Sequence, residues 1–136
     1  MRLALLAALL AAAVAATAAP AKEGAVARLT TRLPLRAAPG TTIRVGWTVT
    51  VPDGHGHRRG FGAGDMFVRL LSRTGARPTT ADARSSSSAV GRYWARIVVP
   101  KGGMGGIRFG LRGWNDFGEA DVFFPLQNDP FKAKRK

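Results

Sequence analysis

The chain has 136 residues, no cysteine and a formal net charge of +13. That length fits one domain around a single hydrophobic core, and the absence of cysteine excludes disulfides and a lipid-modified N-terminal cysteine. The 21 basic residues against 8 acidic ones predict attraction to polyanions. The alternative is that arginine is enriched throughout the chain without any relation to a binding partner.

The N-terminus has the pattern of a secretory signal. The positive start Met1-Arg2 precedes an unbroken apolar run from Leu3 to Ala16, and small residues follow it. The run is shorter than the roughly 20 residues of a membrane-spanning helix. We therefore predict a signal helix over residues 1–21, cleaved after Ala21 or, as the alternative, after Ala18. A retained N-terminal anchor is the other interpretation.

Alternating apolar and polar residues predict about seven short strands. The clearest is Thr42 to Val51 (TIRVGWTVTV), in which every second residue from Ile43 is apolar. One face of this strand should pack in the hydrophobic core and the other should face solvent, with Trp47 at the centre of the core. The other expected strands are 25–35, at an edge because it contains Pro34, then 65–72, one within 77–84, 92–99, 107–112 and 120–126.

These strands are regularly spaced, and no amphipathic helical stretch lies between them. The pattern predicts an all-β fold for residues 22–127, an immunoglobulin-like antiparallel β-sandwich that follows the signal helix. A small barrel is the alternative. Residues 128–136 show no pattern to fold around and are expected to form a disordered basic tail.

The strand from Gly91 to Pro100 carries a family likeness. Its residues Gly91, Tyr93, Ala95, Ile97 and Val99, followed by proline, match the G-x-Y-x-A-x-[VI]-x-[VF]-P stretch that is typical of one exported family. From Pro39 to Leu126 the chain resembles the secreted YtkA-like or FixH-like domains of bacteria. The resemblance implies a small exported immunoglobulin-like sandwich without a catalytic motif, with some relatives encoded near copper-handling or cytochrome-assembly machinery.

The two histidines of the chain form a His-Gly-His sequence in a glycine-rich loop. His55 and His57 can both reach one ion, which makes copper or zinc the candidate metal. Asp116 is the candidate third ligand if the loops share one end of the sandwich. The alternative is a solvated loop with incidental histidines, and the adjacent Arg58-Arg59 pair repels a cation.

The segment Gly113 to Glu119 is expected to be a turn with two aromatic residues. Trp114 and Phe117 could form a rim for carbohydrate or peptide, or fold back and plug the end of the sandwich. The tail offers further cations for an anionic surface, at Lys132, Lys134, Arg135 and Lys136.

No enzyme is predicted. The four serines Ser85 to Ser88 have no histidine and aspartate partners nearby in the sequence, and the carboxylates are too scattered to form an acid/base pair. We expect a secreted or extracytoplasmic, non-catalytic module that binds anionic polymer or lipid at the cell envelope, without specific nucleic acid and without a transmembrane span in the mature chain. The second hypothesis is an exported copper- or zinc-binding protein.

Overall fold

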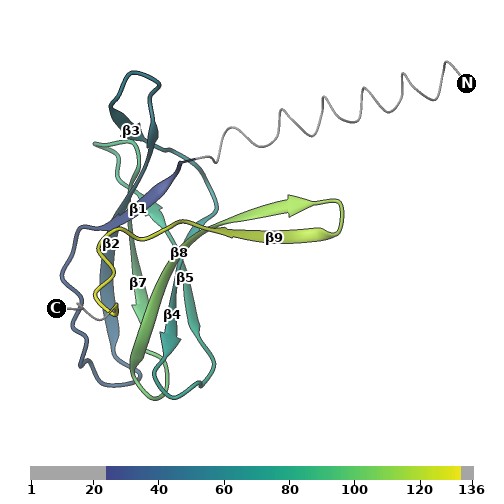
Figure 1. The fold of residues 1–136 in the computed structure, drawn as a ribbon. Coiled ribbons are helices and arrows are strands. Elements are labelled where there is room, and N and C mark those ends of the chain that lie inside the picture. Colours follow the sequence, from purple (N-terminus) through teal and green to yellow (C-terminus); the bar gives the residue numbers. More distant parts are fainter. Residues whose placement is uncertain (1–23, 133–136) are drawn as a thin grey trace, which may run out of the picture.

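The computed structural model describes residues 24–132, which form two antiparallel sheets packed face to face (Figure 1). Sheet A contains, in spatial order, β1 (Val26–Leu29), β2 (Thr42–Pro52), β7 (Arg92–Val98) and β6 (Arg84–Ser85), and β3 (Arg58–Gly60) also pairs with β2. Sheet B contains, in order, β5 (Thr79–Asp82), β4 (Met66–Ser72), β8 (Met104–Asn115) and β9 (Gly118–Phe123). The strand orders correspond to the ABED and C′CFG sheets of immunoglobulin domains. The predicted sandwich is confirmed, with nine strands among the described residues instead of about seven, and the predicted signal helix over residues 1–21 lies outside the described residues.

The core lies between the two sheets and is centred on Trp47. Its side chain has no exposed surface, and its ring stacks on Phe109 of sheet B, with 4.5 Å between ring centroids, and on Tyr93 of β7, at 5.9 Å. The other inward residues of β2 are Ile43, Val45, Val49 and Val51, and all are buried. The alternation read from the sequence of this strand is therefore confirmed.

The loop between β3 and β4 is tied to sheet A by one buried tyrosine. The hydroxyl of Tyr93 donates to the carbonyl oxygen of Phe61 at 2.7 Å and accepts from the backbone N–H of Ala63 at 3.0 Å. The backbone also crosses closely here, because a Cβ on Gly91 would lie 2.7 Å from the Cα of Gly60. Gly91 has a φ of +84°, so glycine is required there for both space and conformation.

The segment expected to be a seven-residue turn is instead the end of a long hairpin. Strand β8 continues to Asn115 and β9 begins at Gly118, so only Asp116 and Phe117 form the turn. Figure 1 shows this β8–β9 hairpin projecting from the side of the sandwich. Gly118, directly after the turn, has a φ of +116°, a conformation that glycine adopts without strain.

The fold extends beyond the boundary predicted at residue 127. The side chain of Asn128 accepts from the backbone N–H of Leu29 at 2.8 Å and donates to the carbonyl oxygen of the same residue at 3.0 Å. Phe131 packs against the core. The expected disorder does not extend to residues 128–131, because the backbone of residues 125–127 pairs with Ala27 of β1 and the amide of Asn128 continues this pairing at Leu29. Within the described part of the chain, no helix is long and apolar enough to cross a membrane.

Candidate functional site

The charges of the two sheets are segregated. The strands of sheet A contain seven arginines and no acidic residue: Arg28, Arg44, Arg58, Arg59, Arg84, Arg92 and Arg96. The strands of sheet B contain three arginines and three acidic residues: Arg69, Arg108, Arg112, Asp82, Glu119 and Asp121. Strand positions alone thus give sheet A a formal charge of +7 and leave sheet B neutral.

Five of these arginines share the outer surface of sheet A with Trp94. Strand alternation turns them away from the core, and all five are exposed, whereas Trp94 is half-buried. We call this set the arginine face: Arg28, Arg44, Arg84, Arg92 and Arg96. Four strands contribute to it, and the register of β1, β2, β7 and β6 brings them together.

Trp94 holds two of the guanidinium groups in place. The guanidinium carbon of Arg44 lies 4.3 Å from the ring centroid, and that of Arg84 lies 5.4 Å away. The two arginines come from the strands on either side of β7. A stacked guanidinium keeps its N–H edges free to donate to an anion, so the ring orients these donors without consuming them.

The arginine face places like charges next to one another. Arg44 and Arg96 are directly opposite each other on β2 and β7, an arrangement that destabilises a sheet. Both ion pairs found within residues 24–132 belong to sheet B. A bound anion would neutralise this repulsion and would therefore stabilise the folded protein.

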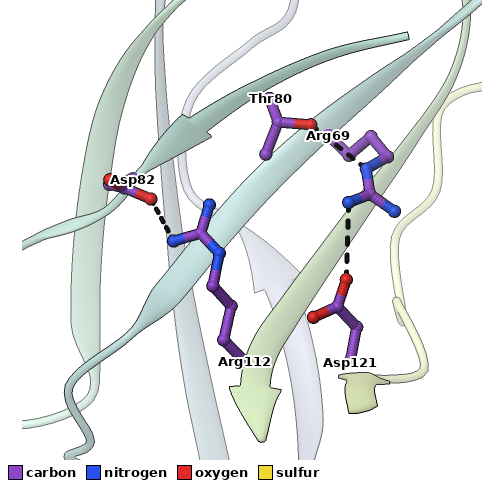
Figure 2. Close-up of polar contacts among 5 residues, drawn as sticks. All are labelled: Arg69, Thr80, Asp82, Arg112 and Asp121. Carbon is purple, nitrogen blue, oxygen red and sulfur yellow. Dashed lines mark hydrogen bonds and ion pairs between the residues drawn. The ribbon is translucent and has the colours of Figure 1, made fainter. Parts of the chain in front are cut away.

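The outer surface of sheet B shows the opposite arrangement (Figure 2). Arg69 donates to the hydroxyl of Thr80 at 3.1 Å and forms an ion pair with Asp121 at 3.5 Å. Arg112 forms an ion pair with Asp82, and this hydrogen bond raises the pKa of Arg112 above its ordinary value. These guanidinium groups already have anionic partners and are poor candidates for an external one.

The paired arginines of sheet B also cover an aromatic side chain. Phe67 is fully buried although it lies on the outer side of β4, since it fits over Gly110 and packs edge to face against Phe123 at 5.7 Å. The guanidinium carbons of Arg69 and Arg112 lie 5.1 and 5.2 Å from its ring centroid. Packing on Phe67 therefore accounts for Arg69 and Arg112.

The backbone of the predicted metal loop is held by hydrogen bonds to Asp53. Oδ1 of Asp53 accepts the backbone N–H groups of His55 and His57 at 2.7 and 3.1 Å, and both histidines are exposed. Among residues 24–132, no three His, Asp or Glu side chains gather where they could hold a metal ion. The structure therefore does not group Asp116 with the histidines.

The predicted aromatic rim and the predicted tail contacts are only partly described. Phe117 is 98% exposed at the hairpin turn, so it does not plug the end of the sandwich. Trp114 lies in β8 opposite Glu119. Lys132 is exposed just beyond Phe131, whereas Lys134, Arg135 and Lys136 lie outside the described residues.

The sequence contained a signal for the arginine face that the nominated sites did not include. Arg92, Trp94 and Arg96 alternate with buried residues, so their outward direction followed from the period of the strand. Arg28, Arg44 and Arg84 lie up to 64 residues earlier in the chain, counted from Arg28 to Arg92. Only the pairing of the strands shows that they share one surface with Trp94.

Comparison with protein families, with curated proteins and with solved structures finds no match for the chain.

Proposed function

We propose that the chain is an exported, non-catalytic module of immunoglobulin-like architecture that binds an anionic polymer of the cell envelope through the arginine face. The observation that supports this most directly is the segregation of charge, with seven arginines and no acidic residue in the strands of sheet A. A surface of one sign attracts polyanions from a distance and binds them by releasing their counterions.

A general excess of arginine would not produce this distribution. On sheet B, Arg69 and Arg112 form ion pairs with carboxylates and cover Phe67, so these two arginines have a structural role. On sheet A the five arginines of the face have no carboxylate partner among the described residues. Their like-charge contacts cost stability in the free protein, and binding a polyanion recovers that cost.

The test is retention of the purified protein on isolated cell envelopes, compared between two variants that lose the same charge. The variant Arg28→Gln/Arg96→Gln removes two arginines of the face, and Arg36→Gln/Arg108→Gln removes two exposed arginines outside it. We expect the first variant to bind about tenfold more weakly and the second to change less than about threefold, since salt-dependent binding follows the contacts made with the polyanion. Equal losses in the two variants would indicate attraction by net charge alone and would contradict the proposal.

A further inference from the structure

A small recess opens on the arginine face beside Trp94. Its volume is about 210 Å³, and its lining includes Thr30, Thr31, Arg44, Gly46, Ser86, Arg92 and Trp94. Pockets that enclose whole small molecules usually measure about 300–1,000 Å³. This recess is therefore sized for one charged group that remains attached to a longer chain outside it.

The two threonines of the recess lie against the backbone of Gly46. A Cβ on Gly46 would lie 2.9 Å from Oγ1 of Thr30 and 3.0 Å from Cγ2 of Thr31, so only glycine allows this crossing. Oγ1 of Thr31 accepts the backbone N–H of Gly46 at 2.9 Å. Because that hydroxyl serves as an acceptor here, its own hydrogen is left to donate to another group.

The donors of the recess come from several directions and meet no acid. Arg44 and Arg92 reach it from β2 and β7, the threonines from the segment after β1, and Ser86 from the turn after β6. No lining residue is acidic. The neighbouring recess of about 460 Å³, which Trp94 also lines, contains Asp82 and is less favourable to an anion.

We propose that this recess binds one phosphate group of the anionic polymer, an inference that rests on the proposed function and specifies its ligand. Two guanidinium groups and hydroxyl donors suit a tetrahedral oxyanion, which has more acceptor oxygens than a planar carboxylate. Arg44 already stacks on the indole ring at 4.3 Å, so a nucleobase would have to displace it in order to stack there. The lining includes no aliphatic side chain that could enter a bilayer. A phosphate-bearing polymer without bases fits best.

The experiment measures binding of inorganic phosphate and of inorganic polyphosphate to the purified protein at constant ionic strength. The amide NMR signals of Thr31 and Gly46 report on the recess. We expect Arg44→Gln/Arg92→Gln to weaken phosphate binding about tenfold or more, and Arg28→Gln/Arg96→Gln, of equal charge, to weaken it less than about twofold. Arg44→Lys keeps the charge but loses the planar pair of donors, so it should weaken phosphate binding several-fold. Thermal melts of each variant confirm that it is folded.

The outcomes separate this inference from the proposed function. If both double variants weaken phosphate binding equally, the recess is not a phosphate site. In that case the proposed role of the arginine face stands if polyphosphate binding is weakened by either double variant. If the envelope retains neither the protein nor its variants but phosphate binding still depends on Arg44 and Arg92, the recess stands and the proposed function falls. Tighter recess-dependent binding of single-stranded DNA or of phosphatidylglycerol vesicles than of polyphosphate would overturn the choice of ligand.

Discussion

The two tryptophans on opposite sides of sheet A allow a direct test of the fold. Trp47 points into the core and has no exposed surface, whereas Trp94 points outward and is half-buried. Replacing a buried aromatic residue with alanine typically costs about 3–5 kcal/mol. Among residues 24–132, the indole Nε1 of Trp47 has no hydrogen-bond partner, and removing an unsatisfied buried donor returns about 1–3 kcal/mol.

We therefore expect Trp47→Ala to lower the free energy of unfolding by about 2 kcal/mol, taking about 4 kcal/mol for the lost packing and about 2 kcal/mol for the relief. Trp94→Ala loses the two cation–π contacts and partial packing on a wet surface, which should cost about 1 kcal/mol. Trp47→Phe keeps most of the stacking on Phe109 and removes the unsatisfied donor, so its cost should be about 1 kcal/mol or less.

The assay is urea denaturation followed by circular dichroism, with one slope fitted to all variants. Without disulfides, a loss of about 2 kcal/mol is a measurable part of the roughly 5–15 kcal/mol that stabilises a typical domain. Equal destabilisation by Trp47→Ala and Trp94→Ala would refute the assignment of the two faces of sheet A.

Three further predictions concern the backbone, the C-terminal segment and the histidine loop. Gly91→Ala should destabilise the protein by at least about 2 kcal/mol in urea denaturation, because its Cβ would meet the backbone of β2 and β3. The control Gly54→Ala, at a residue with a φ of +83° and open space, should cost only about 1 kcal/mol. Similar costs for the two variants would argue against the close crossing of the backbone at Gly91. Asn128→Ala should cost about 1–2 kcal/mol through its two lost hydrogen bonds, and no change in the urea midpoint would mean that this segment does not hold β1. If His55 and His57 bind copper or zinc, either ion should raise the melting temperature and chelator should reverse the shift, as linkage requires; His55→Ala should abolish the shift, and a midpoint that does not move with metal removes the hypothesis.

The strands of the core were predictable because burial imposes a strict period. Residues from Ile43 to Val51 alternate without interruption, and the structure buries every second one. The end of the β8–β9 hairpin, residues 113–119, was expected to be a turn because Gly113 and Gly118 disfavour strands in isolation. Pairing with a neighbouring strand overrides that preference, since strand propensity depends strongly on context.

The arginine face could be predicted only in part. The outward direction of Arg92 and Arg96 followed from alternation within one strand. The convergence of Arg44 and Arg84 on Trp94 depends on which strands are neighbours and in what register, and single-strand patterns do not contain that information. The burial of Phe67 was missed for the same reason, because it requires Gly110 on the paired strand.

The salt dependence of polyphosphate binding tests the central claim most directly. If all five arginines of the face contact phosphate groups, the logarithm of the binding constant should fall with the logarithm of salt concentration with a slope of about −3.5, at roughly 0.7 per contact for a flexible strand. The variant Arg28→Gln/Arg96→Gln should reduce the slope to about −2, and Arg36→Gln/Arg108→Gln should leave it unchanged. A slope near zero, or one that changes equally in both variants, would contradict the account.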